Sequence, residues 1–308
     1  MRHGLASLLI LTLLAACGQV ITITLPFGMQ RAAPLPAGYG LLFSPAPHAF
    51  AYVGAPEPVR LGLRSERFEL RDADCGGSDC GNFRARAEIA EAPDATVALL
   101  DRDIWYGWSF YNANIRSVSR ETWLGTVIGQ WKLDGAQPSI FRFIQQAQGE
   151  GNWATCNPAI CNPAGAATDD VVVQLDDLRQ TRNWGDAENN GNICRLWGLE
   201  ANLGRWVDVV VNTNFGTDGY GYLRIWVNGQ MRCNYTGPLL SAERARSLVT
   251  GPTHRRGIFN SYTQRWAENQ GATPKPTLIA LYDEFRIGLS RADVDTRLRE
   301  VSRIAPLD

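Results

Sequence analysis

Three stretches of the sequence alternate polar side chains with apolar or small ones, so each would present charged or amide groups on one face of a β-strand. Their polar members are Arg84, Arg86 and Glu88 in the first stretch, Gln130 and Lys132 in the second, and Arg256, Asn260, Tyr262 and Gln264 in the third. Guanidinium, ammonium and amide groups bind carboxylates, and the ten tryptophans and nine tyrosines offer flat surfaces on which sugars stack. Each face alone is typical of a solvated sheet surface, but converging faces would form a groove for an anionic sugar chain.

These residues lie in a succession of short segments with the two-residue period of half-buried strands. Strands are expected at residues 67–71, 84–89, 104–110, 126–132, 140–144, 171–175, 206–212, 222–228, 256–262 and 279–287. Helices are expected only at 241–249 and 290–301, each of which opens with a serine that can cap the first turn. Many short strands separated by Gly, Asn and Asp predict an all-β sandwich of antiparallel strands with minor surface helices.

The N-terminal residues have the pattern of an export signal. Arg2 precedes an apolar run, and Leu14-Ala15-Ala16 leads into Cys17, which predicts a lipoprotein signal peptide at 1–16 and lipidation of Cys17. An ordinary signal peptide with an incidental cysteine is the alternative. Because Gly18 is not acidic, we expect an outer-membrane lipoprotein that faces the periplasm or the cell surface. Residues 17–58 are rich in Pro, Ala and Gly and predict a tether, and 59–308 predict one domain.

The other six cysteines form an even set, which in an exported chain indicates disulfides. They are Cys75, Cys80, Cys156, Cys161, Cys194 and Cys233. The first two and the next two are each close enough to close a small loop, which leaves the last two to pair, although sequence alone permits other pairings. A zinc site is the rival interpretation, but the spacing lacks nearby histidines.

The net charge of −1 shows no nucleic-acid footprint across the whole chain. We expect a monomer, with no required cofactor and no metal, whose partner is an anionic polysaccharide and whose only membrane contact is its N-terminal lipid. Asp-rich loops at 169–170, 176–177 and 186–192 could bind calcium, but this composition is typical of solvated turns.

Several longer motifs follow one another along residues 60–288. They are Arg67-Phe68-Glu69-Leu70-Arg71, Asp74-Cys75-Gly76, Arg86-Ala87-Glu88-Ile89, Trp105-Tyr106-Gly107-Trp108-Ser109, Gly129-Gln130-Trp131, Gly257-Ile258-Phe259 and Asp283-Glu284-Phe285-Arg286-Ile287-Gly288. Their order resembles the polysaccharide lyase family that includes heparin lyase I and is structurally akin to alginate lyases. The resemblance implies a jelly-roll (concanavalin-like) β-sandwich that cleaves uronic-acid polysaccharides by β-elimination.

That reaction needs a group that neutralises the uronate carboxylate, a base that removes the proton on carbon 5, and an acid that protonates the departing oxygen on carbon 4. By position, Arg86 and Gln130 resemble the pair that neutralises the carboxylate, and Glu88 would orient Arg86 through a charge-assisted hydrogen bond. The residues expected to bind substrate around them are Arg84, Glu88, Arg256, Asn260, Gln264 and His254.

Two positions depart from the family's pattern. Relatives typically have a histidine where this chain has Lys132, and a tyrosine where it has Phe259. Lys132 can replace the histidine as base only if burial or neighbouring arginines lower its pKa toward neutrality. Tyr262 can replace the tyrosine as acid only if a bulge brings it to the face of Phe259. His254 is a reserve base, although a plain loop residue is the more common role for such a histidine.

The sequence therefore predicts a polysaccharide lyase with Arg86, Gln130, Lys132 and Tyr262 around the scissile bond. The main alternative is a surface carbohydrate-binding module that keeps the groove but has lost the acid and the base. A glycoside hydrolase on a similar sandwich would need two facing carboxylates; Glu88 is available, but no strand carries a paired acidic motif such as Glu-x-Asp-x-x-Glu.

Overall fold

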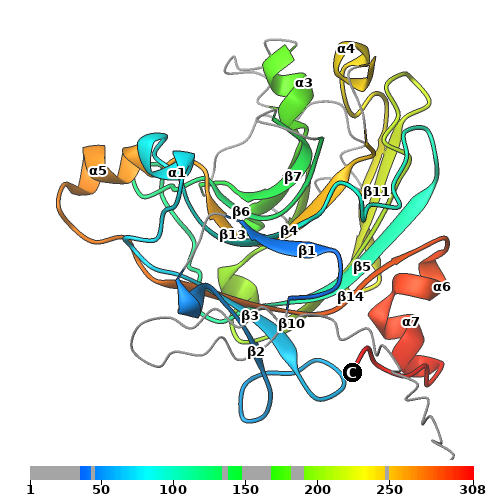
Figure 1. Cartoon of the computed structure of the whole chain (residues 1–308), viewed down its shortest axis with the longest axis horizontal. Helices are drawn as coiled ribbons and strands as arrows, with labels where there is room; N and C mark the ends of the chain where they lie inside the picture. The colour runs from blue at the N-terminus through cyan, green and yellow to red at the C-terminus, as the bar shows by residue number, and fades with distance from the viewer. Residues whose placement is uncertain (1–34, 43–45, 134–137, 148–167, 182–190, 247–249) are drawn as a thin grey trace, which may run out of the picture.

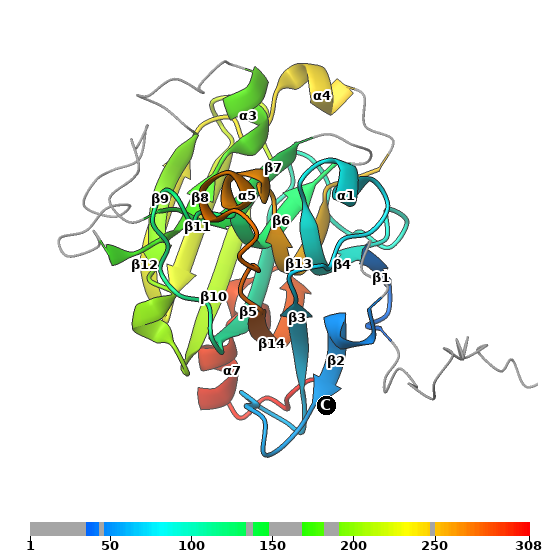
Figure 2. The same cartoon turned by 90° about the vertical axis from the view of Figure 1, so that its left-hand side faces the viewer.

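The computed structural model describes residues 35–42, 46–133, 138–147, 168–181, 191–246 and 250–308. In these ranges the chain forms two seven-stranded antiparallel sheets (Figures 1 and 2), so the all-β sandwich expected from the sequence is confirmed. The first sheet runs in the order β1 (Tyr39–Leu42), β4 (Ala85–Glu91), β13 (Thr253–Asn260), β6 (Thr126–Lys132), β7 (Ser139–Gln145), β8 (Val171–Gln174) and β9 (Asn192–Trp197).

The second sheet runs in the order β12 (Gln230–Thr236), β11 (Tyr222–Val227), β10 (Trp206–Thr213), β5 (Ile104–Asn112), β14 (Leu278–Gly288), β3 (Ser65–Leu70) and β2 (Phe50–Val53). The described helices are short and lie outside the two layers. They are η1 (Pro47–Ala49), α1 (Ser78–Gly81), α3 (Asp176–Thr181), η3 (Glu200–Asn202), α4 (Ala242–Arg246), α5 (Gln264–Gln270), α6 (Arg291–Val294) and α7 (Thr296–Val301).

The core lies between the sheets and is rich in aromatic rings. Trp131 of β6 is fully buried there, stacked on Phe141 with the ring centroids 4.4 Å apart, and it meets Tyr106 of the second sheet edge to face. Because successive side chains of a strand point to opposite faces, the burial of Trp131 directs its neighbours Gln130 and Lys132 to the outer face of the first sheet. That outer face carries the candidate site.

The sandwich begins earlier in the chain than the sequence suggested. β1 pairs with β4 and β2 pairs with β3, although both strands come from the segment 17–58 that was expected to be a tether. The domain therefore begins before residue 59, which the sequence predicted as its first residue. Their alternation was hidden because each strand is only four residues long and lies among Pro, Ala and Gly.

One expected strand also ends earlier than predicted. The segment 256–262 was expected to be extended throughout, but β13 ends at Asn260, and a turn leads into α5. The serine-initiated helix at 290–301 is divided into α6 and α7 at Asp295, whose side chain accepts hydrogen bonds from the backbone N–H groups of Arg297 and Leu298.

Two disulfides join described cysteines. Cys75 is bonded to Cys80, as their spacing predicted, and Cys194 is bonded to Cys233, the pair that remained among the expected pairings. The first closes the small loop that carries α1, whereas the second lies in the core and links β9 to β12. Cys17, Cys156 and Cys161 lie outside the described residues, as does the expected signal peptide.

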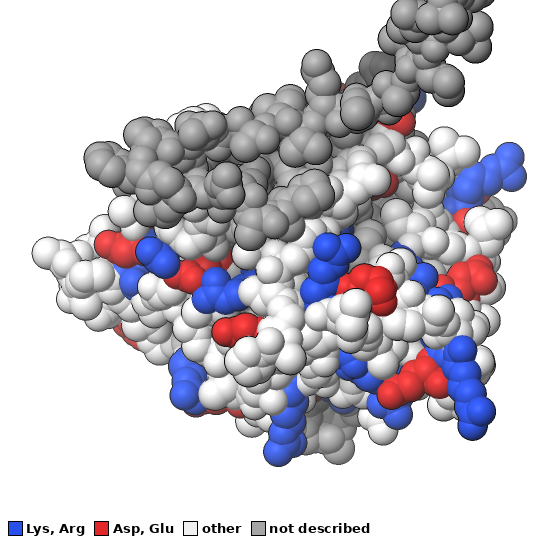
Figure 3. All heavy atoms as spheres, turned by 60° about the horizontal axis from the view of Figure 1, so that its bottom comes forward, with Lys and Arg blue, Asp and Glu red and all other residues white. Residues whose placement is uncertain are grey.

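Charged side chains on the face that Figure 3 shows are interspersed, with basic and acidic groups side by side rather than gathered by sign. This distribution agrees with the net charge of −1. None of the helices in the described ranges is long and apolar enough to cross a membrane.

Candidate functional site

A pocket of about 400 Å³ on the outer face of the first sheet is lined by side chains from β4, β6, β7 and β13 and from α3 and α5. Figure 1 shows these two helices beside the sheet. Five of the residues expected in the site line it, namely Arg84, Arg86, Gln130, Lys132 and Tyr262. The four residues expected around the scissile bond are therefore brought together in one cavity, although they come from two different strands and a turn.

Arg86 lies on the pocket wall in a tight polar setting. Its Nε and Nη2 atoms donate to the two carboxylate oxygens of Asp79 at 2.5 and 2.9 Å, and its Nη1 donates to Glu88 at 3.0 Å. Its guanidinium also stands over the ring of Phe259, 4.0 Å from the centroid. Two buried carboxylates keep Arg86 charged despite burial, and they raise its pKa.

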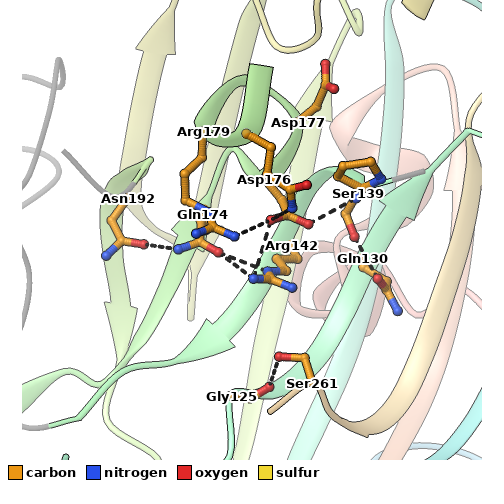
Figure 4. A network of polar contacts seen from close by, with 12 residues as sticks. Gly125, Gln130, Ser139, Arg142, Gln174, Asp176, Asp177, Arg179, Asn192 and Ser261 are labelled. Carbon is orange, nitrogen blue, oxygen red and sulfur yellow. Dashed lines mark hydrogen bonds and ion pairs between the residues drawn. The ribbon is translucent and has the colours of Figure 1, made fainter. Parts of the chain in front are cut away.

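Gln130 is oriented by both ends of its amide. The Nε2 atom donates to Glu88 at 2.5 Å, and the Oε1 atom accepts from the hydroxyl of Ser139 at 2.7 Å (Figure 4). An amide nitrogen carries two N–H groups, so one remains to donate to another acceptor. Glu88 therefore accepts from both Arg86 and Gln130 and holds the two donors side by side.

The backbone beside Glu88 requires a glycine. Gly257 has a φ of +129°, and a Cβ atom at this position would lie 2.3 Å from the carbonyl oxygen of Ala87 and 2.8 Å from Cα of Glu88. Only a residue without a side chain lets β13 approach β4 this closely where Glu88 stands. This explains the glycine in the Gly257-Ile258-Phe259 motif.

Lys132 is a half-buried ammonium in a basic environment. Burial is the main cause that lowers its pKa to about 8, and the nearby charge of Arg255 lowers it further. Among the described residues, no carboxylate lies within ion-pair distance of Lys132. A substantial fraction of this amine is thus neutral at mildly alkaline pH, which is the state that can accept a proton.

Tyr262 reaches the pocket because β13 has already ended. Its backbone N–H donates to the carbonyl of Leu124, and the Ser261 hydroxyl donates to the carbonyl of Gly125, so the turn is tied to the segment that precedes β6. Its ring lies 6.2 Å from that of Trp123, and the guanidinium of Arg265 stands over both rings. β13 carries a register shift between Arg256 and Phe259 and ends at Asn260, and Tyr262 reaches the pocket from the turn beyond the strand.

A second polar network lies on the part of the pocket wall formed by β7 and α3, away from the contact between Ser261 and Gly125 (Figure 4). Arg142 of β7 donates to the Gln174 side chain at 2.7 and 3.0 Å and lies 3.4 Å from Asp176, which also pairs with Arg179 at 3.1 Å. Asp176 accepts from the backbone N–H of Ser139 as well. The network therefore fixes the residue that orients Gln130.

The electrostatic character of the pocket is positive. Its basic lining residues are Arg84, Arg86, Lys132, Arg142, Arg179 and Arg265. None of its described lining residues is Asp or Glu, and the carboxylates that pair with Arg86, Arg142 and Arg179 lie outside the lining. Such a cavity favours an anionic ligand.

Of the six residues expected to bind substrate, only Arg84 lines the pocket. Glu88 is buried behind Arg86 and Gln130, and the other four lie elsewhere, so the expectation of one polar face from Arg256 to Gln264 is wrong. Arg256 points toward the second sheet and donates two hydrogen bonds of 2.6 Å to Glu66. Asn260 is buried and accepts from the hydroxyl of Thr126, and Gln264 lies on α5 and donates to Glu268. Arg256 and Asn260 lie within β13 but are buried instead of facing the pocket, and Gln264 lies beyond the strand, which ends at Asn260.

His254, the expected reserve base, is a core residue. Its ring stacks on Phe285 with centroids 4.4 Å apart and lies 4.9 Å from the ring of Trp131. Burial lowers its pKa well below the usual value. It is 1% exposed and does not line the pocket, so it has no path to a substrate held there.

Sequence reasoning missed several residues that build the site. Asp79, Ser139, Arg142 and Trp123 were not singled out, since each lies outside the alternating polar faces or belongs to a strand read as apolar. Asp79 lies within the loop closed by Cys75 and Cys80, and that short loop before a polar strand was the one available signal.

In the described parts of the Asp-rich loops, the carboxylates contact other side chains of the same chain. Asp169 pairs with Arg232, Asp170 accepts from Gln145, and Asp177 pairs with Arg244. In the described part of the chain, no group of three or more His, Cys, Asp or Glu side chains is arranged to hold a metal ion.

Comparisons with known proteins identify the family of this chain. A family model described as polysaccharide lyase matches residues 49–286, whereas no curated protein sequence matches significantly. Among solved structures, the chain is similar to an endo-β-1,4-glucuronan lyase from the fungus Trichoderma reesei, with 16% identity, a TM-score of 0.46, and 80% of this chain and 89% of that chain covered.

Two further similar structures are alginate lyases. For one of polysaccharide lyase family 7, the identity is 12%, the TM-score 0.43, and the coverage 82% of this chain and 94% of that chain. For one from Pseudomonas aeruginosa, the identity is 14%, the TM-score is 0.38, and the coverage is 73% of this chain and 82% of that chain. The family model alone spans well over half of the sequence, and the chain therefore belongs to the polysaccharide lyase family.

Proposed function

We propose that this protein is a polysaccharide lyase that cleaves a uronate-containing anionic polysaccharide by β-elimination. The observation that carries the proposal is the convergence of Arg86, Gln130, Lys132 and Tyr262 on one positively charged pocket. Membership of the family supports the reaction class, and the pocket's charge supports an anionic substrate.

The substrate carboxylate would lie against Arg86 and Gln130. The positive charge of Arg86 and an N–H of Gln130 stabilise the negative charge that spreads onto the carboxylate when carbon 5 loses its proton. Because Glu88, Asp79 and Ser139 already hold both donors in place, little reorganisation is needed as that charge develops.

The proton transfers then fall to Lys132 and Tyr262. The neutral amine of Lys132 takes the proton from carbon 5, and the released electron pair forms a double bond between carbons 4 and 5. The bond from carbon 4 to the glycosidic oxygen breaks, and the Tyr262 hydroxyl protonates that oxygen. The products are an unsaturated uronate at one new chain end and a free hydroxyl at the other, so no water is consumed.

A glycoside hydrolase is disfavoured by the lining of the pocket. Such an enzyme needs two carboxylates that flank the scissile bond. In the described lining no carboxylate faces the cavity, and Glu88 is 1% exposed and hydrogen-bonded to Arg86 and Gln130.

The direct test is to incubate the purified protein with alginate, glucuronan and heparin-type polymers and to follow the absorbance of the unsaturated uronate. We expect product from at least one of these polymers. Binding without product on the whole panel would instead favour a carbohydrate-binding module.

The pH dependence of turnover provides a second test. With a pKa of about 8, Lys132 is neutral in about one tenth of molecules at pH 7 and about nine tenths at pH 9. Only the neutral amine accepts a proton, so kcat/KM is expected to rise with pH through an apparent pKa near 8 and then level off. A profile that falls between pH 7 and 9 would exclude Lys132 as the base.

Replacing the proposed acid should affect turnover but not binding. Tyr262→Phe keeps the ring beside Trp123 and removes the hydroxyl, so we expect kcat to fall about 100-fold while the affinity for polymer stays nearly unchanged. The effect is limited because water can also protonate the leaving oxygen. Tyr220→Phe is the control, since Tyr220 is 85% exposed and lies outside the pocket lining. Unchanged turnover in Tyr262→Phe would assign the acid to another group.

We also propose that the protein works as an outer-membrane lipoprotein, on the periplasmic or cell-surface side. The disulfides Cys75–Cys80 and Cys194–Cys233 support an oxidising compartment. Labelling with a radioactive fatty acid, compared between the native chain and Cys17→Ala, tests the anchor.

A further inference from the structure

The loop that precedes β4 is anchored at both ends. Asp74 accepts hydrogen bonds from His48 Nε2 and from the backbone N–H of Arg71, each at 2.7 Å, and Cys75 is bonded to Cys80. At the other end, the backbone N–H of Arg84 donates to the carbonyl of Asp79. The disulfide thus closes a short loop around α1 and restricts where Asp79 can lie.

Asp79 is buried, whereas the rest of this loop is exposed or half-buried. It is 1% exposed, and its two oxygens accept from Nε and Nη2 of Arg86 in the two-pronged geometry that fixes a guanidinium in both position and orientation. Glu88 contacts the third nitrogen, Nη1. The ring of Phe259 packs against the guanidinium, and the two hydrogen bonds to Asp79 restrict its rotation more tightly than the single bond to Glu88 can.

The same loop supports the side of the pocket that carries Tyr262. The carbonyl of Phe83 accepts from the backbone N–H of Thr263 at 2.8 Å. Phe83 adopts a φ of +53°, a left-handed conformation that is costly for a residue with a side chain, and is half exposed. One short loop therefore touches the segment of the proposed acid and the side chain that neutralises the carboxylate.

We propose that Asp79 is a positioning residue for Arg86, and that the Cys75–Cys80 disulfide holds Asp79 in the place where it acts. This inference rests on the proposed lyase function. Asp79 does not line the pocket and touches no substrate; it acts through Arg86. A merely structural role would predict lower stability alone, whereas a positioning role predicts slower turnover in a folded protein.

Asp79→Asn is the primary test, because the amide keeps the size of the side chain and removes the charge. We expect kcat to fall about 10- to 100-fold with a smaller change in KM, and Asp79→Glu to recover part of the loss. Measurements are made below the melting temperature of each variant. Wild-type kcat in folded Asp79→Asn would overturn the proposal.

A second pair of variants addresses the disulfide and leaves the Asp79–Arg86 contact chemically intact. Cys75→Ser/Cys80→Ser frees a loop in which Cys80 is exposed, and kcat is expected to fall about 10-fold. The matched control is Cys194→Ala/Cys233→Ala, whose sulfurs are fully buried in the core far along the chain. It should lower the melting temperature but leave kcat unchanged where the protein is folded. Equal kcat losses in both pairs would refute a specific role for the Cys75–Cys80 loop.

A readout that needs no substrate separates this inference from the lyase proposal. The Nε–H group of Arg86, held by Asp79, should give a slowly exchanging signal in a 15N-correlated NMR spectrum, assigned by its absence in Arg86→Lys. We expect the signal to be lost in Asp79→Asn and broadened in Cys75→Ser/Cys80→Ser. An inactive wild-type protein that shows this behaviour would refute the lyase proposal alone, whereas an unaltered signal in Asp79→Asn would refute the positioning role whatever the activity.

Discussion

Replacing Lys132 with methionine is expected to abolish nearly all turnover and to make the protein more stable at neutral pH. Methionine fills a similar volume but cannot accept a proton, so kcat should fall about 10³- to 10⁴-fold, the upper part of the range for loss of a general base. The loss should persist at every pH, because no ionisation restores the amine. Steady-state production of unsaturated uronate from pH 6 to 10 measures it.

The gain in stability follows from the direction of the pKa shift. Burial and Arg255 lower the pKa of Lys132 to about 8 in the folded protein, from an ordinary value of 10.5. Between these two values the unfolded chain binds more protons than the folded one, so the free energy of unfolding rises with pH. Below about pH 8 the folded protein carries the full cost of a buried cation, and Lys132→Met removes it. Discounting for partial exposure, we expect an increase of about 1–3 kcal/mol at pH 7.

The chain offers a matched control, since Lys275 is its only other lysine. Lys275 lies outside the pocket lining and pairs with Asp72 at 2.6 Å. Lys275→Met should leave kcat unchanged and alter stability by less than about 1 kcal/mol. A Lys132→Met protein that retains turnover with a rise near pH 8 would show that another group is the base.

The sequence predicted the part of this site that regular strands position. In β4 and β6, strict alternation places Arg86 and Glu88, or Gln130 and Lys132, on one face, because the intervening side chains enter the core. The pKa of Lys132 shifts in the direction that its proposed role requires, and the cause is burial. The alternation depends on local sequence alone, whereas the pKa shift also needs the folded sheet, because burial and the neighbouring strand that carries Arg255 produce it.

The rest of the site depends on where strands end and on which distant segments meet. Tyr262 reaches the pocket because β13 stops at Asn260. Beyond that residue the chain is no longer extended, so the alternation of side chains in a strand does not predict where Tyr262 points. Arg256 shares the face of the core, where Glu66 of the other sheet makes its burial tolerable. Asp79 could not be placed from spacing, since only the folded loop turns its carboxylate toward Arg86. Local periodicity thus predicts faces, whereas partners and strand ends require the tertiary structure.

Arg86→Lys is the second substitution expected to have a large effect. Lysine keeps a positive charge but loses the planar fork that Asp79 and Glu88 hold, so the charge would no longer lie at a fixed distance from the substrate carboxylate. The loss should appear mainly in the transition state, where the carboxylate gains electron density, and kcat should fall about 10²- to 10³-fold. Steady-state kinetics on the cleaved polymer measures both kcat and KM.

Arg86→Lys could slow turnover simply by destabilising the fold. Arg256→Lys is the control for that effect. Arg256 is also a buried arginine on the first sheet that donates two hydrogen bonds to one carboxylate, that of Glu66, but it faces away from the pocket. Both substitutions should lower the free energy of unfolding by about 1–3 kcal/mol, because each weakens a buried ion pair without leaving its carboxylates wholly unpaired. Only Arg86→Lys should slow turnover in the folded protein. If the two variants lost kcat equally, the effect would reflect the integrity of the sheet, and Arg86 would have no special place beside the reacting sugar.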